Sequence, residues 1–284
     1  MNWTTLVSPR ELAARLGEPG LVLVDCRNVA GGADTGAGRR AWREAHLPGA
    51  GHAHLDEDLS DKRKPASEGR HPLPESADFA ALLGRLGIGP GDQVVAYDAG
   101  DGAMAAARLW WLLRLFGHRR VAVLDGGLAA WQAAGLPLDT RTPDPKPAYP
   151  GRFDLDAVVG SEAVHARLGE APGWLLDART PERFRGEVEP LDPVAGHIPG
   201  ARNRPFQANL RDGRFLPPAE LRDGFEALLA GRSPDSVVLA CGSGVTACHN
   251  LLAMEHAGLA GARIYAPSWS GWVSDPARPV ATGD

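Results

Sequence analysis

The sequence predicts an α/β protein made of two tandem copies of one domain, each an open, mainly parallel sheet flanked by helices. Its 284 residues exceed the usual length of a single domain. Short apolar runs such as "LVLVD" (21–25) and "VVLAC" (237–241) alternate with stretches of helical periodicity. This alternation is typical of buried parallel strands that are joined by helices.

An internal repeat supports the two-domain interpretation, because landmarks of the first half recur in the same order in the second half. The matched pairs are "LVLVDCR" (21–27) with "GWLLDAR" (173–179), "AHLPGA" (45–50) with "GHIPGA" (196–201), and "VVAYDAGDG" (94–102) with "VVLACGSGV" (237–245). Several matches in one order indicate a duplicated domain.

Proline and capping residues predict where domains and helices begin. We expect a first domain over residues 1–139, a linker over 140–151 and a second domain over 152–284. The linker carries four prolines, which stiffen a chain and exclude it from helices and central strands. Ser8 is expected to cap a helix that has Pro9 in its first turn and Glu11 closing a capping box, and Ser161 to cap its equivalent.

Charge and composition exclude several classes of function. The formal net charge is −5 and the arginines are scattered among acids, so no nucleic-acid partner is expected. The chain has no run of about 18 apolar residues and no basic start followed by an apolar core, which predicts a cytoplasmic protein without membrane contact. Three cysteines form no CxxC pair, and HExxH, GxxxxGK[ST] and strand-linked GxGxxG motifs are absent. We therefore expect no metal, no cofactor and no disulfide framework. Chemistry at a free cysteine is the class of reaction that these observations leave open.

Cys241 stands where such chemistry would occur. A predicted strand ends just before it, "CGSGV" (241–245) forms a loop, and a helical pattern follows. Ligands of open parallel sheets bind at this edge. Gly242 and Gly244 permit tight backbone turns whose amide N–H groups can point at one centre, while the helix adds its positive end. The sequence therefore predicts a site that stabilises a thiolate or a persulfide.

The first half places Asp98 at the position of Cys241, so the scaffold does not require sulfur there. Only the second domain is expected to be catalytic, with the first as a structural partner that helps to form the cleft. Cys26, at the end of another strand, is expected to be buried and inert. His46 and His197 occupy equivalent turns of both halves, which favours a structural role.

The motifs together resemble those of a known family. "DxR" and "H[IL]PGA" in both halves, the "CGSGVT" loop (241–246) and the "SWSGW" tail (268–272) are similar to those of the two-domain rhodanese sulfurtransferases. The resemblance covers nearly the whole chain, and the loop is most like that of the members that use 3-mercaptopyruvate. It implies two tandem rhodanese-like domains, of which the first lacks the catalytic cysteine.

The resemblance also implies a reaction. Cys241 would take a sulfur atom from 3-mercaptopyruvate as a persulfide, pyruvate would leave, and the outer sulfur would pass to cyanide or to a thiol, such as thioredoxin or a small thiol. The donor, a small anionic molecule, would be surrounded by the loop residues Gly242, Gly244, Val245 and Thr246. No metal or cofactor would take part.

Three residues are implied to handle protons. Ser243 would lie beside the substrate, His71 in "EGRHPLP" would relay a proton, and Asp58 in "LDEDLSD" would orient the histidine. Without the resemblance, His71 and Asp58 would be assigned to surface loops. Both belong to the first half of the sequence, which would explain why a half without the catalytic cysteine is retained.

Recognition of the donor carboxylate is implied to require two arginines, whose guanidinium fork matches a carboxylate. Arg183 in "DARTPERFRG" corresponds to the first, but the window of the second contains Leu191, Asp192 and Pro193. This departure leaves thiosulfate as an alternative donor. The arginines that could compensate are Arg185, Arg202 and Arg204.

Two other classes of function are alternatives. A cysteine phosphatase needs an arginine six residues after its nucleophile, where this chain has Ala247, which argues against that activity. A non-catalytic sulfur-carrier or regulatory protein would not need an intact Cys241 loop.

Overall fold

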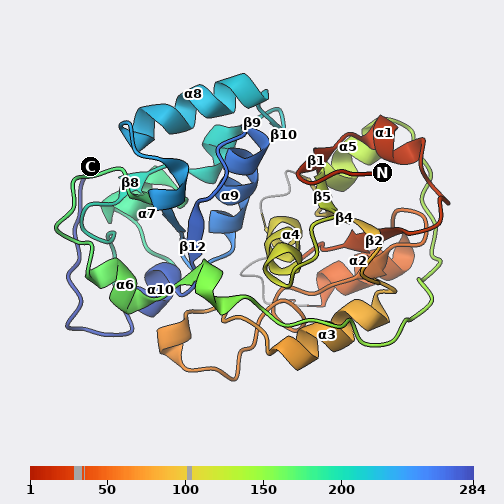
Figure 1. Cartoon of the computed structure of the whole chain (residues 1–284), viewed down its shortest axis with the longest axis horizontal. Coiled ribbons are helices and arrows are strands. Elements are labelled where there is room, and N and C mark those ends of the chain that lie inside the picture. The colour runs from red at the N-terminus through yellow and green to blue at the C-terminus, as the bar shows by residue number, and fades with distance from the viewer. Residues whose placement is uncertain (29–33, 35, 101–103) are drawn as a thin grey trace. The chain divides into compact units, whose positions relative to one another are not determined.

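The computed structural model describes residues 1–28, 34, 36–100 and 104–284 (Figure 1). The chain divides into two compact units. The first unit contains Met1–Asp61 and Pro74–Asp154, and the second contains Lys62–Leu73 and Leu155–Asp284.

The first unit is a five-stranded parallel sheet with the strand order β1-β5-β4-β2-β3. Its strands are β1 (Leu6–Val7), β2 (Leu21–Asp25), β3 (Gly51–His52), β4 (Gln93–Tyr97) and β5 (Val121–Leu124). The helices that flank it are α1 (Pro9–Ala13), α2 (Ala37–Glu44), α3 (Ser76–Arg85), α4 (Ala105–Leu115) and α5 (Gly127–Ala133). A 3₁₀ turn at Ala66–Glu68 lies in the segment Lys62–Leu73, which belongs to the second unit.

The second unit repeats this plan with the order β6-β12-β11-β7-β8, and its strand pairs are also parallel. Its strands are β6 (Val158–Val159), β7 (Leu175–Asp177), β8 (Arg202–Asn203), β11 (Val238–Ala240) and β12 (Arg263–Tyr265), with an antiparallel hairpin of β9 (Leu210–Arg211) and β10 (Arg214–Phe215). Its helices are α6 (Ser161–His165), α7 (Pro181–Arg185), α8 (Pro218–Leu229), α9 (Thr246–His256) and α10 (Ser268–Trp272), with 3₁₀ turns at Leu155–Ala157, Phe206–Asn209 and Pro234–Ser236.

The predicted fold class and duplication are confirmed, because the two sheets have the same strand order. The equivalent turns agree in detail. His46 forms an isolated bridge with Asp139, and His197 forms the equivalent bridge with Ala281. Each histidine also bonds a backbone carbonyl through Nδ1, at 2.6 and 2.8 Å. The bridges tie each turn to a segment that is distant in the chain, which agrees with the structural role that the repeat predicts for both histidines.

Two segments pack differently from the predicted domain boundaries. Residues 140–151 belong to the first unit, where the amides of Lys146 and Tyr149 donate to the carbonyls of Gly84 and Ala80 at 2.8 and 3.0 Å. These bonds hold the proline-rich segment along α3. The other segment, Lys62–Leu73, precedes α3 in the chain yet packs in the second unit.

The first predicted helix start is confirmed and the second is wrong. Ser8 caps α1 in a capping box, with its side chain accepting from the Glu11 amide and Glu11 accepting from the Ser8 amide. Ser161 is instead the first residue of α6, after Gly160 as N-cap. Its hydroxyl is engaged elsewhere, because it bonds the hydroxyl of Tyr265 at 2.8 Å.

Each sheet buries an apolar core against its neighbouring helices. The core of the second unit lies between strands β7, β11 and β12 and helices α6 and α10, which contribute Val164, Trp269 and Trp272. In the part of the chain that the structure describes, no helix is both long and apolar enough to cross a membrane.

Candidate active site

Cys241 follows β11 directly, at the carboxyl edge of the second sheet. Its side chain is buried, since the residue is only 2% exposed. The Cys241 amide donates to the hydroxyl of Ser268 at 3.1 Å, and the Cys241 carbonyl accepts from the Trp269 amide at 2.9 Å. The first turn of α10 therefore fixes the backbone of the cysteine on both sides.

The sulfur lies within a tight loop before α9, as predicted. The Gly244 amide donates to the Cys241 Sγ at 3.1 Å, and the Ser268 hydroxyl lies 4.0 Å from the same sulfur. Gly244 has φ +75°, and a Cβ there would lie 2.3 Å from the Ala266 carbonyl oxygen, so only glycine fits. Val245 is the N-cap of α9 and Thr246 its first residue. The Gly244 amide is therefore the near donor to the sulfur, while the Ser268 hydroxyl donates to the Tyr265 carbonyl at 2.9 Å.

Ser243 and His71 are brought together. The Ser243 hydroxyl lies 2.7 Å from Nδ1 of His71, within the second unit. Asp58 belongs to the first unit, where its carboxylate accepts from the His54 amide at 2.8 Å and from Arg85 at 2.9 Å. The pairing of Asp58 with His71 stays a prediction.

Arg183, on α7, lies beside the loop but is already paired with an acid. Its Nη2 donates to Glu189 at 2.7 Å, and its Nε donates to the same carboxylate at 3.2 Å. Burial alone would raise the pKa of Glu189, but the bonds from Arg183 and from two backbone amides lower it. A Cβ added to Gly242 would lie 3.4 Å from both terminal nitrogens of Arg183.

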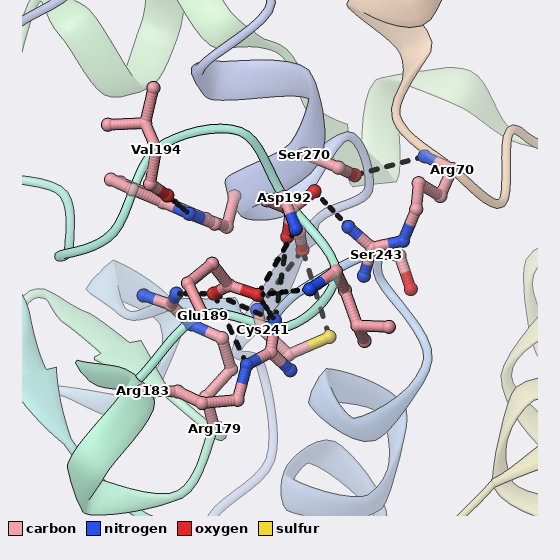
Figure 2. A network of polar contacts seen from close by, with 12 residues as sticks. Arg70, Arg179, Arg183, Glu189, Asp192, Val194, Cys241, Ser243 and Ser270 are labelled. Carbon is pink, nitrogen blue, oxygen red and sulfur yellow. Dashed lines mark hydrogen bonds and ion pairs between the residues drawn. The ribbon is translucent and has the colours of Figure 1, made fainter. Parts of the chain in front are cut away.

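Arg183 is part of a row of alternating charges, shown in part in Figure 2. We call it the guanidinium row; its members, in order of contact, are Asp177, Arg179, Glu189, Arg183, Asp192 and Arg70. The ion pairs between Asp177 and Arg179 and between Glu189 and Arg183 both measure 2.7 Å.

Asp192 links the last two arginines of the row, through Oδ1 to Arg70 and through Oδ2 to Arg183 at 3.5 Å. Burial would lower the pKa of Arg179, yet the charges of Asp177, Glu189 and Cys241 raise it. The guanidinium row therefore brings fixed charges to the cysteine loop.

The arginines expected to compensate for the missing second arginine are bonded elsewhere. Arg185 pairs with Glu187 at 2.8 Å, Arg202 donates to the Leu228 carbonyl at 2.9 Å, and Arg204 donates to Asn209 at 3.0 Å.

Sequence reasoning missed three contributors to the site: Ser268, Arg70 and Glu189. Ser268 stands in the "SWSGW" motif and Arg70 stands next to His71, so both lie in stretches that the sequence had marked. Their contacts join residues that are far apart in the chain, as between Arg70 and Asp192. A sequence pattern does not reveal such pairs.

The other two cysteines are fully buried. Burial raises the pKa of the Cys26 thiol well above its usual range, and the charges of Asp98 and Asp25 add to the effect. Cys248 lies on α9, where its thiol donates to the Gly244 carbonyl at 3.3 Å. Among the residues that the structure describes, no group of three His, Cys, Asp or Glu side chains is arranged to hold a metal ion.

Comparison with known proteins assigns both units to one family. A family model described as a rhodanese-like domain matches residues 8–134 and 161–275. A Pseudomonas aeruginosa protein, provisionally named a 3-mercaptopyruvate sulfurtransferase, is 50% identical over the full length of both chains. A Mycobacterium tuberculosis protein, provisionally named a thiosulfate sulfurtransferase, is 41% identical over 98% of this chain and 97% of its own.

A solved structure agrees with this assignment. The crystal structure of a 3-mercaptopyruvate sulfotransferase from Escherichia coli has a TM-score of 0.80 and 32% identity, covering 94% of this chain and 99% of that one. With both sheets matched and Cys241 in the loop that follows β11, the chain belongs to the rhodanese family.

Proposed function

We propose that this protein is a sulfurtransferase that moves a sulfur atom from 3-mercaptopyruvate through a persulfide on Cys241 to an acceptor. The observation that carries the proposal is the environment of the Cys241 sulfur, which accepts the Gly244 amide at 3.1 Å just before α9. The names of several relatives, such as the Pseudomonas aeruginosa protein at 50% identity, support the choice of donor.

In the first half-reaction, the Cys241 thiolate attacks the sulfur of the donor. A sulfur–sulfur bond forms and the carbon–sulfur bond of 3-mercaptopyruvate breaks. The bonding electron pair leaves on the methylene carbon as the enolate of pyruvate, which a proton converts to pyruvate. The Gly244 amide remains available to the sulfur anion throughout, as a preorganised donor.

In the second half-reaction, a nucleophile takes the outer sulfur of the persulfide and Cys241 leaves as a thiolate. The general requirement is an anionic sulfur donor and a thiol or cyanide acceptor. We expect thioredoxin or a small thiol to fill the second role, in the cytoplasm.

Ser243 and His71 are suited to deliver the proton that the enolate needs. Their side chains lie 2.7 Å apart, so the hydroxyl can pass a proton that the imidazole replaces. Asp58 is retained as the predicted orienting group of His71. If it has this role, Asp58→Asn lowers kcat for pyruvate formation without preventing persulfide formation from a donor that needs no proton.

Thiosulfate is the alternative donor. The 41%-identical Mycobacterium tuberculosis relative is named for it, and the window Leu191–Pro193 lacks the arginine that the family resemblance led us to expect. Thiosulfate would transfer its outer sulfur to Cys241 and leave as sulfite, with no enolate to protonate.

The first experiment tests the mechanism. We expect incubation with 3-mercaptopyruvate to release pyruvate and to add the mass of one sulfur to Cys241, and Cys241→Ser to abolish both. Cys26→Ala is the matched control, because Cys26 also follows a strand but is expected to be inert. Full activity of Cys241→Ser would refute the mechanism.

The donor is then decided by steady-state kinetics with each candidate under the same acceptor. A higher kcat/KM for 3-mercaptopyruvate supports the proposal, whereas a clear preference for thiosulfate would replace it with the alternative.

A further inference from the structure

We propose that Arg70 binds the donor carboxylate together with Arg183, and that Asp192 positions Arg70 for this task. The inference deepens the proposed function and rests on it, because it assumes a donor that carries a carboxylate. It assigns a binding role to a residue that lies outside the sequence window in which a second arginine was expected.

The two guanidinium groups converge on one point beside the nucleophile. A Cβ at Gly242 would lie 3.1 Å from Nη2 of Arg70 and 3.4 Å from Nη1 and Nη2 of Arg183. Gly242 follows Cys241 directly, so the two Cα atoms are about 3.8 Å apart. Only two carbon atoms separate the sulfur of 3-mercaptopyruvate from its carboxylate carbon. A donor can therefore present its sulfur to Cys241 and its carboxylate to both arginines.

Each arginine also keeps, near the loop, one terminal nitrogen that donates to no acid of the guanidinium row: Nη2 of Arg70 and Nη1 of Arg183. Asp192 accepts from Nη1 of Arg70, and Glu189 accepts from Nε and Nη2 of Arg183. Among the hydrogen bonds of the described residues, none joins an acid to Nη2 of Arg70 or to Nη1 of Arg183. An arginine has five N–H donors, so each can hold an acid on one side and a ligand on the other.

Exposure separates the cations of the row from its acids. The side chains of Arg70 and Arg183 are 29% and 18% exposed, whereas those of Glu189 and Asp192 are each only 3% exposed. A ligand that approaches the row therefore meets guanidinium groups first. The buried carboxylates of Glu189 and Asp192 offset part of the positive charge of Arg70 and Arg183. The remaining charge favours a monoanionic carboxylate over a dianion such as thiosulfate.

The backbone of Arg70 is tied to the same loop. The Arg70 amide donates to the hydroxyl of Ser270 at 3.0 Å, and the Ser270 amide donates to the Gly242 carbonyl at 2.9 Å. Figure 2 shows the bond between the Arg70 amide and Ser270. The position of Arg70 is thus fixed at both its backbone and its guanidinium group.

The kinetic test is Arg70→Gln. Loss of a charge-assisted bond to the carboxylate should raise KM for 3-mercaptopyruvate about 10- to 100-fold and leave kcat within about threefold. The ratio of kcat/KM for 3-mercaptopyruvate to that for thiosulfate should fall at least about fivefold. Arg70→Lys, which keeps the charge but loses the fork, should fall between Arg70→Gln and wild type. Arg185→Gln is the matched control, because Arg185 pairs with Glu187.

A binding test separates this inference from the proposed function. Pyruvate carries the same carboxylate but donates no sulfur, so calorimetric titration of Cys241→Ser with pyruvate reports the clamp alone. We expect Arg70→Gln to weaken this binding about tenfold and Asp192→Asn to weaken it by less. If wild type does not turn over 3-mercaptopyruvate but pyruvate binding still depends on Arg70, the proposed function fails and the clamp stands.

Equal binding of pyruvate with and without Arg70 would overturn the clamp. Equal losses of kcat/KM for both donors would overturn it as well, because they would indicate a role in loop structure only.

Discussion

Asp98 and Cys241 occupy equivalent positions in the two units and carry different side chains. Each follows a central strand of its sheet, β4 or β11. The Asp98 carbonyl accepts from the Leu128 amide at 3.0 Å, and the Cys241 carbonyl accepts from the Trp269 amide at 2.9 Å. The domain duplication has therefore kept the backbone that fixes this position.

The side chains show what the position offers. The Asp98 carboxylate accepts from the amides of Met104 and Ala106 at 3.3 and 3.0 Å, at the start of α4. The Cys241 sulfur accepts from the Gly244 amide before α9. In both units, backbone amides at or just before a helix start donate to the side chain at this position. The first unit fills it with a carboxyl group, and the second with the sulfur at which we propose the transfer.

The two units also differ at the residue that precedes the amide donating to the carbonyl of Asp98 or of Cys241. Gly127 and Ser268 share a left-handed backbone, with φ of +56° and +53°. A Cβ at Gly127 would lie 2.2 Å from the Gly100 carbonyl oxygen, so a side chain is excluded there. At Ser268 a side chain fits, and its hydroxyl accepts the Cys241 amide. The second unit therefore has a hydroxyl that accepts a hydrogen bond from the Cys241 amide, at a position where the first unit has no room for a side chain.

The largest expected effect comes from moving the cysteine. We expect the double variant Cys241→Ser, Asp98→Cys to remain at least about 1,000-fold less active than wild type. A thiol at position 98 lacks the Ser268 hydroxyl, because Gly127 stands at the equivalent position of the first unit. Persulfide formation at position 98, detected by peptide mass spectrometry, would contradict the division into a catalytic and a structural unit.

An intermediate effect is expected on stability. Asp98→Ala removes a buried acceptor from two amides and should lower the free energy of unfolding by about 2 kcal/mol, as measured in urea. Asp98→Asn keeps one acceptor and should cost less. Cys241→Ala should cost under about 1 kcal/mol, because its sulfur accepts a single amide. If the Cys241 variant were the less stable one, the assignment of structure to the first loop and chemistry to the second would be wrong.

The smallest effect is expected from Ser268, whose hydroxyl accepts a hydrogen bond from the Cys241 amide. Ser268→Gly gives the second loop the residue found at the equivalent position of the first, and its positive φ suits glycine. Loss of the hydroxyl leaves the Cys241 amide without its acceptor, and we expect kcat/KM to fall about five- to tenfold with the fold retained. Ser268→Ala is the companion variant. An unchanged kcat/KM in both would show that the hydroxyl does not position the cysteine.

Local patterns were sufficient to predict the fold and the loop that holds Cys241. The duplicated strands, the capping box at Ser8 and the glycine-rich loop of Cys241 each depend on residues that are close in the chain. Ser161 shows where local patterns fail, because Tyr265 takes its hydroxyl from more than 100 residues away in the chain.

The sequence by itself determined the α/β class, the duplication and the position of Cys241 in a glycine-rich loop after a strand, since periodicity, repetition and loop composition can be read from neighbouring residues. Only the tertiary structure decided which arginines meet at the loop. Arg70 and Asp192 are 122 positions apart, and their ion pair forms because folding brings Lys62–Leu73 into the second unit. A sequence does not show which acid a distant arginine will pair with. Ion pairs between residues so far apart in the chain therefore depend on how the segments pack.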